Sequence, residues 1–108
     1  MNYEFIDEID LKNMRLDRLF SRVLMCSYMY YDGRIESPWT DSQYDYACKR
    51  LHDEYDNFDH VNKNLLSKEA LKAGSGFSIK YTERIRIASE IWRNIYKKQI
   101  IERIENGR

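Results

Sequence analysis

Residues 37–45 have the sequence SPWTDSQYD, which contains the clearest helix start of the chain. Thr40 and Gln43 have the spacing of a capping box, in which each side chain accepts a hydrogen bond from the backbone N–H of the other residue. Asp41 follows the cap directly, where its negative charge interacts favourably with the helix dipole. We therefore expect a helix from about Asp41 to Asp56.

Apolar residues at three- and four-residue spacing predict helices on both sides of this start. One helix is expected over residues 7–31, ending where Asp32-Gly33 lets glycine adopt the left-handed conformation that terminates helices. A short capped helix is expected over residues 67–74, and a long one over about 82–105. The sequence thus predicts one all-α domain over residues 1–108: a small helical domain with two long helices, a capped middle helix and a short connecting helix.

The last predicted helix carries more apolar residues than one neighbouring element would cover. They include Ile85, Ala88, Ile91, Trp92, Ile95, Tyr96, Ile100 and Ile104. Such a broad face is typical of a helix at the centre of a core, which we favour; the alternative is a helix that pairs with another chain. In the second case the last helix would join two copies as a homodimer, and a candidate partner surface is formed by Trp39, Trp92 and Tyr96.

Composition excludes a disordered chain and a membrane span. Hydrophobic residues make up 43% and charged residues 33% of the 108 residues, which is enough apolar surface for one core. No stretch approaches the roughly 20 apolar residues of a transmembrane helix, and Met1–Asp10 lacks the features of a secretion signal. We expect a cytoplasmic protein in which Cys26 and Cys48 are buried thiols, with a disulfide between them as the open alternative.

Charge is distributed unevenly, although the formal net charge is zero. Residues 1–60 carry 13 acidic and 7 basic side chains, a net charge of −6, whereas residues 61–108 carry 5 and 11, a net charge of +6. We favour two solvated faces as the interpretation; the alternative is an asymmetry that orients a partner or a second copy. The basic last helix is compatible with nucleic-acid contact, but the zero net charge does not favour it.

Two carboxylates and a phenol share the first turns of the helix that begins at Asp41. Asp41, Tyr44 and Asp45 stand at positions i, i+3 and i+4, so they lie on one surface. Tyr30 and Tyr31 close the preceding helix, and the intervening loop can fold the two helix ends together. Aromatic faces beside carboxylates suit a flat ring that is cationic or carries an amide. In the competing interpretation Tyr44 is a core residue and both acids only favour the helix N-terminus.

The same residues carry a resemblance to a known family. They are Tyr30-Tyr31, a loop with Pro38, Asp41-x-x-Tyr44-Asp45 and Leu51. Over residues 19–58 this pattern resembles the N-terminal helical domain of NAD-dependent DNA ligases, whose Tyr-His pair, proline loop and Asp-x-x-Tyr-Asp motif hold the nicotinamide mononucleotide half of NAD. The resemblance implies a site for NAD or nicotinamide mononucleotide made by Tyr30, Tyr31, Asp41, Tyr44 and Asp45. Tyr31 stands where the family has histidine.

No catalytic motif accompanies this site. Adenylyl transfer by the ligases needs a nucleophilic lysine in a Lys-x-Asp-Gly motif, and the only Asp-Gly of the chain, Asp32-Gly33, has Tyr30 at the lysine position. Gly74-Ser75-Gly76 lacks the lysine of a phosphate-binding loop and is predicted to be a hinge. His52 and His60 are poorly spaced for a compact helical metal site. We expect neither catalysis nor a bound metal.

Together these observations favour a small, non-catalytic cytoplasmic binding protein that acts on a macromolecular partner, in the first instance another protein. We expect a regulator or inhibitor of the kind that phages and mobile elements encode. The alternative is a nicotinamide-nucleotide binding module related to the ligase domain, with NAD or nicotinamide mononucleotide as its only ligand.

Overall fold

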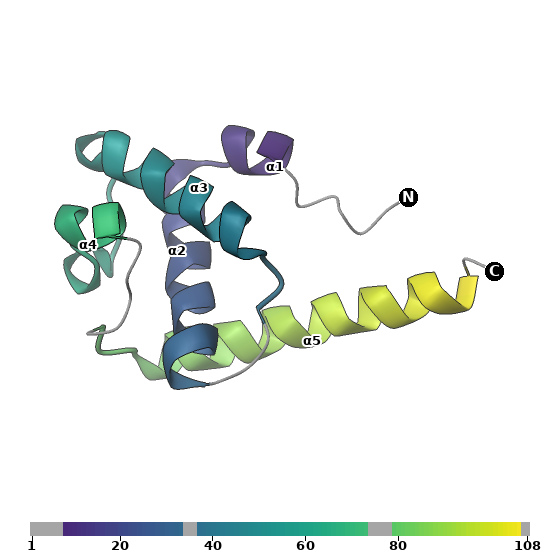
Figure 1. Cartoon of the computed structure of the whole chain (residues 1–108). Coiled ribbons are helices and arrows are strands. Elements are labelled where there is room, and N and C mark those ends of the chain that lie inside the picture. Colours follow the sequence, from purple (N-terminus) through teal and green to yellow (C-terminus); the bar gives the residue numbers. More distant parts are fainter. Residues whose placement is uncertain (1–7, 34–36, 74–78, 107–108) are drawn as a thin grey trace.

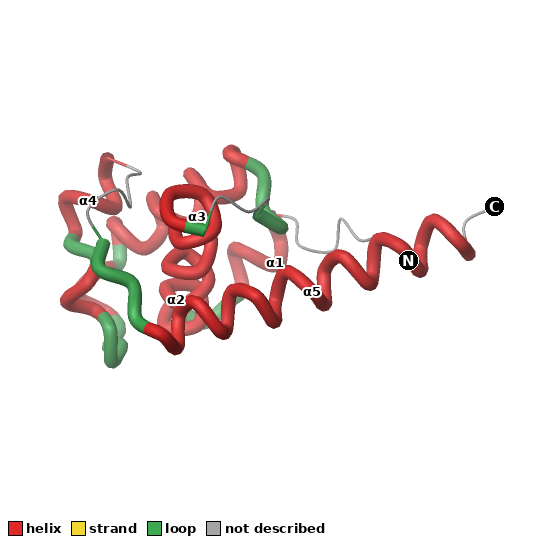
Figure 2. Tube along the Cα trace, turned by 90° about the horizontal axis from the view of Figure 1, so that it is seen from below, coloured by secondary structure: helices red, strands yellow, loops and turns green. Residues whose placement is uncertain are grey.

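The computed structural model describes residues 8–33, 37–73 and 79–106. In chain order the elements are α1 (Glu8–Asn13), α2 (Leu16–Ser27), the π-helical turn η2 (Tyr28–Asp32), α3 (Asp41–Asp53), the 3-10 turns η3 (Tyr55–Asn57) and η4 (Lys63–Leu65), α4 (Lys68–Ala73) and α5 (Glu83–Asn106). These residues form helices, turns and loops but no strand (Figures 1 and 2). The predicted all-α fold is therefore confirmed.

Helix α2 lies at the centre of the molecule (Figure 1). It contacts α3, which crosses it on one side, and α5, which crosses near its C-terminal end. Helix α3 also contacts α1 and α4. The second half of α5 extends well beyond the other helices in both ribbon views. The body is thus a pair of crossed helices that α4 covers at one side and α5 closes at one end.

Buried side chains of α2 organise the core. Leu19, Phe20 and Val23 are fully buried and belong to one hydrophobic cluster with residues from every α-helix. The Phe20 ring packs on Phe58, with ring centroids 5.4 Å apart, and on His60 at 4.9 Å. The segment that follows α3 is therefore anchored to α2 by aromatic contacts.

The first helix is broken, so the prediction of a continuous helix over residues 7–31 is wrong. Arg15 has an extended backbone, with φ of −58° and ψ of 143°, and separates α1 from α2. The Arg50 guanidinium of α3 donates hydrogen bonds to the carbonyl oxygens of Leu11 (2.5 Å) and Met14 (2.7 Å). Such carbonyls are costly to leave unpaired when buried, and a charged donor compensates well for the lost helical bonds. A residue 36 to 39 positions away thus stabilises the break.

The end of α2 also differs from the prediction. Gly33 has φ of −77° and ψ of −20°, which is the right-handed region, and its N–H donates to the Tyr28 carbonyl at 2.7 Å. The helix therefore ends by widening into a π-helical turn, a form that is frequent at functional sites, and not through a left-handed glycine. The predicted hinge at Gly74-Ser75-Gly76 lies outside the described residues.

Three helix starts have the caps that the sequence predicts. The Gln43 N–H donates to Thr40 Oγ1 at 3.2 Å, and the Thr40 N–H donates to Gln43 Oε1 at 2.8 Å, which completes the capping box. Ser67 and Thr82 cap α4 and α5, each by accepting from the N–H three residues later, at 3.1 and 3.2 Å. Helix α3 ends at Asp53, three residues earlier than predicted, because a 3-10 turn follows it.

Candidate functional site

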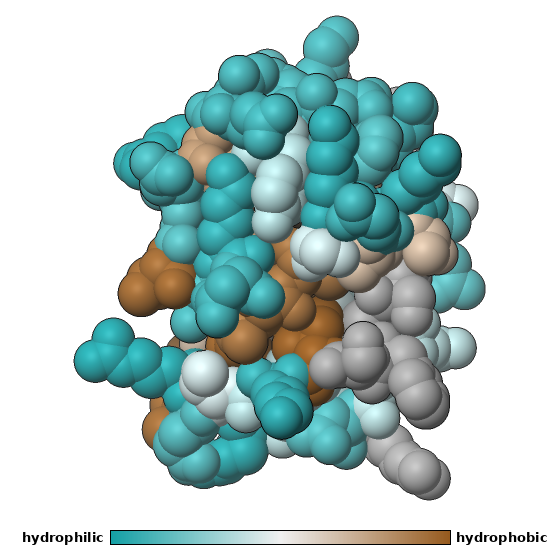
Figure 3. Space-filling view, turned by 90° about the vertical axis from the view of Figure 1, so that its left-hand side faces the viewer, coloured by the Kyte–Doolittle hydropathy of each residue, from teal (hydrophilic) through white to brown (hydrophobic). Residues whose placement is uncertain are grey.

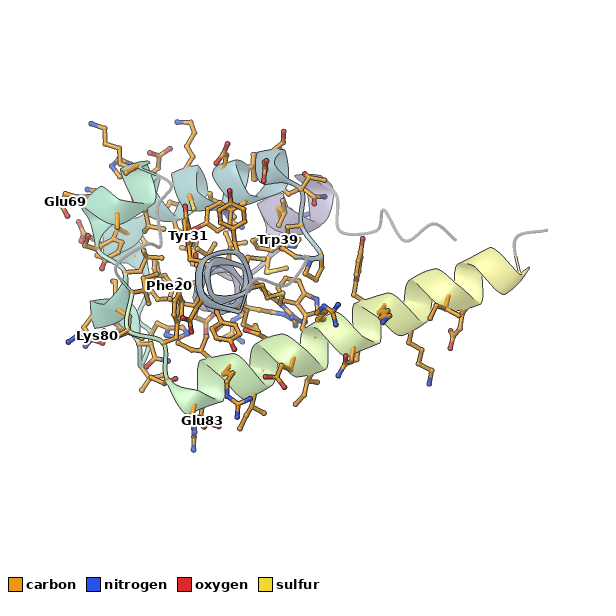
Figure 4. The ribbon with its side chains drawn as sticks, turned by 60° about the horizontal axis from the view of Figure 1, so that its bottom comes forward. Phe20, Tyr31, Trp39, Glu69, Lys80 and Glu83 are labelled. Atoms are coloured by element: carbon orange, nitrogen blue, oxygen red, sulfur yellow. The ribbon has the colours of Figure 1, made fainter. Side chains whose placement is uncertain are left out.

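A cavity of about 290 Å³ lies where the end of α2 meets the start of α3. Its lining residues are Cys26, Tyr30, Tyr31, Ser37, Trp39, Thr40, Asp41, Tyr44 and Asp45. All five residues that the sequence predicts to bind a ligand are among them. Figure 4 shows Tyr31 and Trp39 on the side of α2 that faces α3. The structure therefore brings together the two helix ends as predicted; whether they bind a ligand stays a prediction.

The aromatic part of this cavity has an ordered geometry. The rings of Tyr30 and Tyr31 meet edge to face, with centroids 4.7 Å apart and planes at 90°. Tyr30 is 68% exposed, whereas Tyr31 is half-buried. Asp41 and Asp45 are exposed at the cavity rim. An entering ring would therefore meet aromatic side chains and two carboxylates in one space, the combination that suits a cationic or amide-bearing ring.

Tyr44 acts as a fixed neutral wall of the cavity. Its hydroxyl lies 2.6 Å from Ser27 Oγ, and burial raises the pKa of the phenol well above its ordinary value. A phenol that stays protonated supplies no base. The alternative that Tyr44 is a core residue is thus partly confirmed, since Tyr44 packs against the core and also lines the cavity.

The cavity also contains no activated nucleophile. Cys26 lines it, but burial raises the pKa of this thiol to about 12, and Ser37 Oγ donates a hydrogen bond to Cys26 Sγ at 3.2 Å. Burial raises the pKa of the Cys48 thiol to about 12 as well. Both cysteines are free and buried, so the predicted buried thiols are confirmed and the alternative of a disulfide is not realised. Both thiols therefore stay protonated near neutral pH, where a thiol is a poor nucleophile.

Trp39 and Trp92 do not form the exposed partner surface that the sequence suggested. Their exposed fractions are 5% and 8%, and their rings pack edge to face with centroids 5.6 Å apart. The Arg22 guanidinium lies over the Trp92 ring, 4.3 Å from its centre. The Trp39 Nε1 group is buried without a hydrogen-bond partner among the described residues. The two indoles instead join α5 to the start of α3, and Tyr96 is half-buried one turn further along α5.

The exposed apolar side chains of α5 lie on the opposite face from the indole. Ile85, Ser89 and Trp92 are buried and follow one another at helical spacing, so they define the inner face. The outer face consists of Ile87 (45% exposed), Ile91 (55%), Ile95 (51%) and Ile101 (47%). At about 100° per residue Ile87 and Ile101 lie opposite the inner residues, Ile91 lies between the two faces on the outer side, and Ile95, three residues after Trp92, lies at the edge next to the inner face. The predicted central position of the last helix is therefore wrong for this face, which no described residue covers.

The sequence contains a signal that separates the inner from the outer face of α5, although the two faces together look like one broad apolar face. Positions 87, 91, 94, 98 and 101 are spaced four, three, four and three residues apart, which is a heptad pattern, and they exclude Trp92. The inner face is harder to recognise because its middle position is Ser89. This serine is fully buried, and its hydroxyl donates to the Ile85 carbonyl within the helix at 2.6 Å.

A second cavity, of about 200 Å³, lies between α2, the loop after α3 and the start of α5, and contains a serine–histidine contact. Ser21 Oγ and His60 Nε2 are 2.6 Å apart. The Asn62 backbone N–H donates to His60 Nδ1 at 2.9 Å, so the neutral imidazole carries its proton on Nε2 and donates it to the serine. A histidine base would need the reverse tautomer. The pair therefore links two segments and does not activate a nucleophile.

Outside these two cavities, the described residues show neither a metal-binding cluster nor a membrane-spanning helix. Among the described residues no group of three His, Cys, Asp or Glu side chains is placed to hold a metal ion. In the same part of the chain, no helix combines the length and the apolar character that crossing a membrane requires. Figure 3 shows a largely hydrophilic face on the side of α4, with an apolar recess near its centre.

Comparison of the chain with models of protein families, with curated proteins and with solved structures finds no match. The resemblance to the ligase domain therefore stays a prediction.

Proposed function

We propose that this protein is a small, non-catalytic binding protein that acts in the cytoplasm on a protein partner, through the outer face of α5. The observation that carries the proposal is the row of half-exposed isoleucines on a helix that extends beyond the body. Ile87, Ile91 and Ile101 occupy positions of one heptad row, and exposed large apolar side chains at such positions are typical of helices that pair with another helix. A regulator or inhibitor is the form of activity that fits a helix presented in this way.

The chemistry of the outer face favours a protein over a nucleic acid. Nucleic-acid binding depends on basic side chains that neutralise phosphates. Lys98 does lie on this face, but Ile87, Ile91 and Ile95 would gain little from a phosphate backbone. Their burial against apolar side chains would remove surface from water, which is the dominant favourable term in protein association.

Site-specific photo-crosslinking in the native host tests this proposal. A crosslinker at position 91 should capture one protein, and the Ile87→Glu/Ile95→Glu double substitution should abolish the product. The matched control places the crosslinker at position 49, because Lys49 is exposed on α3, away from α5. Identical products from positions 91 and 49 would refute a docking role for the outer face. Crosslinks to nucleic acid would refute the choice of partner class.

A second candidate function is binding of a nicotinamide nucleotide in the cavity between α2 and α3. The observation that favours it is that Tyr30, Tyr31, Asp41, Tyr44 and Asp45 all line this one space. Its volume of about 290 Å³ is near the lower end of ligand pockets, which begin at about 300 Å³. A mononucleotide ring suits this size better than a whole dinucleotide, whose second half would extend into solvent.

Calorimetric titration with NAD and with nicotinamide mononucleotide tests the second candidate. We expect heat from at least one ligand, lost in Asp45→Ala and retained in Asp53→Ala. Asp53 is the matched control because it is an exposed carboxylate of the same helix that does not line the cavity. Absence of heat at millimolar ligand would eliminate this function without affecting the proposal for α5.

A further inference from the structure

The outer face of α5 contains a polar position at its centre. Ile87, Ile91, Asn94, Lys98 and Ile101 follow the heptad spacing along this face. Asn94 is exposed and stands in the middle of the row, with two isoleucines before it and one after it. A single asparagine in a helix–helix seam specifies register and orientation, because its amide is satisfied only by a matching polar group. The seam therefore favours a partner that offers a polar group at one defined position.

Charges beside the seam change sign along the helix. Glu90 lies before Asn94 on one flank, Lys97 lies after it on the same flank at nearly the same distance, and Lys98 follows within the seam itself. At the two ends the order is reversed, since Arg84 lies near the start of α5 and Glu102 near its end. On the two flanks of the seam, Arg84, Glu90, Lys97 and Glu102 therefore read basic, acidic, basic, acidic through Asn94. Arg86 and Arg93 lie further round the helix, and Glu83 is paired with Arg86. Two copies of this helix in antiparallel orientation would therefore place opposite charges next to each other.

Part of this charge pattern is unused within the chain. Arg84, Lys98 and Glu102 are exposed, and none of them has an ion-pair partner among the described residues. Glu90 is paired with Arg86 on its own helix at 2.7 Å, but its side chain is 47% exposed, and a carboxylate accepts several hydrogen bonds. The chain thus presents both halves of an intermolecular ion pair on the same helix.

We propose that the partner of the outer face is a second copy of this chain, with the two α5 helices antiparallel about a two-fold axis near Asn94. This inference rests on the proposed function, whose partner it names. Across the axis Ile87 would meet Ile101, and the two Asn94 amides would pair with each other. Glu90 of each copy would face Lys97 and Lys98 of the other, and Arg84 would lie beside Glu102. An interface of this kind is isologous, which is the common form in homodimers.

The antiparallel arrangement follows from the charges. In a parallel pair the seam residues face their own counterparts, so the two Lys98 side chains would meet, and Glu90 would lie on the opposite flank from Lys97 of the other copy. Like charges across a helix pair are unfavourable, whereas the antiparallel arrangement brings Glu90 to the basic side chains of the other copy. The extended half of α5 would then lie along the half that is anchored to the body of the other copy. The inner face, with Trp92, would stay in contact with its own chain.

Sedimentation equilibrium over a wide range of protein concentration is the first test. We expect the mass to rise towards twice that of the 13.1 kDa chain, and Ile91→Glu to hold it at the monomer value. Val61→Glu is the matched control, because it places the same charge on a 90% exposed apolar residue of a loop and should leave association unchanged. Circular dichroism would establish that the variants keep their helix content.

Charge reversal tests the orientation. We expect Glu90→Lys to weaken association at least tenfold, because it would place three basic side chains together, and the triple variant Glu90→Lys/Lys97→Glu/Lys98→Glu to restore it. Arg86→Gln is the control for the ion pair within the helix, and it should weaken association less than Glu90→Lys does. A dimer that depends on Ile91 but is unaffected by Glu90→Lys would overturn the antiparallel arrangement.

A disulfide placed at the axis gives an independent readout. Asn94→Cys should form an intermolecular disulfide on mild oxidation, because equivalent residues lie close together only near the axis. Cys26 and Cys48 should not form intermolecular disulfides under these conditions, since both are buried. Lys72→Cys, on exposed α4, should stay largely monomeric under the same conditions.

A wild-type chain that remains monomeric at every concentration would overturn the second copy as partner. The product at position 91 judges the proposed function separately: a crosslink to a different protein keeps the proposed function and removes only the second copy, whereas no protein crosslink at position 91 overturns both.

Discussion

Helices α3 and α5 are held in the molecule in different ways. Helix α3 starts in a capping box, contacts α1, α2 and α4, and fixes a break in the chain through Arg50. Helix α5 is almost twice as long, yet its packing residues lie on one face of its first half, and its outer isoleucines have no cover. The comparison separates a helix built into the fold from one that the fold presents to its surroundings.

This difference shows where each helix can contribute to function. The start of α3 lies against the end of α2, so it forms a wall of a defined cavity. The second half of α5 has no such neighbours among the described helices, so it is suited to a partner outside the chain. Substitutions on the two helices, and on the two faces of α5, should therefore have very different effects on stability.

The largest effect should come from the inner face of α5. Trp92→Ala removes a buried ring that packs on Trp39, and we expect it to lower the free energy of unfolding by about 3–5 kcal/mol. Ile91→Ala, on the outer face, should change the free energy by no more than about 0.5 kcal/mol. Denaturant titration at low protein concentration measures both without a contribution from association. Equal losses would contradict the assignment of the two faces.

The next effect concerns the contact that α3 makes with the broken first helix. Arg50→Met removes charged hydrogen bonds to two carbonyl groups while it keeps much of the side-chain volume, and we expect a loss of about 2–3 kcal/mol. Hydrogen exchange should show α1 opening before the rest of the protein. The neighbouring Lys49→Met is the control, because Lys49 takes part only in an exposed ion pair. If Arg50→Met is as mild as the control, the guanidinium does not stabilise the break.

Sequence reasoning succeeded where the deciding signals were local. The capping box at Thr40 involves residues three positions apart, and the cavity follows from two helix ends joined by a short loop, so the grouping of Tyr30 with Asp45 could be predicted. The break after α1 could not, because Arg50, which stabilises it, is remote in sequence. Nothing in a local pattern indicates which carbonyl a distant guanidinium will reach.

Which face of α5 is buried also could not be predicted from the local sequence. An apolar helix with isoleucines on one side and an indole on the other has two candidate inner faces, and packing with α2 chooses between them. The structure places Trp92 inside, against Trp39, and leaves Ile91 outside. The predicted break-free first helix and the predicted left-handed Gly33 failed for a related reason, since tertiary contacts replaced the local preference.

A smaller effect should come from the cap of α3. Thr40→Ala removes the hydroxyl that accepts from the Gln43 N–H, and we expect a loss of about 1 kcal/mol in the free energy of unfolding. Thr40→Ser should recover most of it, since serine offers the same acceptor. Ser42→Ala, at an exposed position in the same turn, controls for a change in helix propensity. An unchanged Thr40→Ala variant would show that α3 is held by its packing alone.

The smallest effect should be a pH dependence at His60, which lies between α2 and the start of α5. Burial lowers the pKa of this imidazole, and Nδ1 already accepts from the Asn62 N–H, so the native state favours the neutral form. The unfolded chain binds a proton near its ordinary pKa of about 6.5. Between that value and the lower folded pKa, the unfolded state therefore binds more protons, and stability falls as pH decreases.

Denaturant titrations from pH 8 to 5 should show this contribution intact above the unfolded pKa and decreasing below it. His60→Gln should flatten this part of the profile, because glutamine does not titrate, whereas His52→Gln should leave it in place. His52 is the matched control because its Nδ1 lies beside an exposed carboxylate, Asp53, at 3.0 Å. If His60→Gln and the wild type lose stability in parallel, another group causes the pH dependence, and the link between α2 and the loop after α3 does not depend on a neutral imidazole.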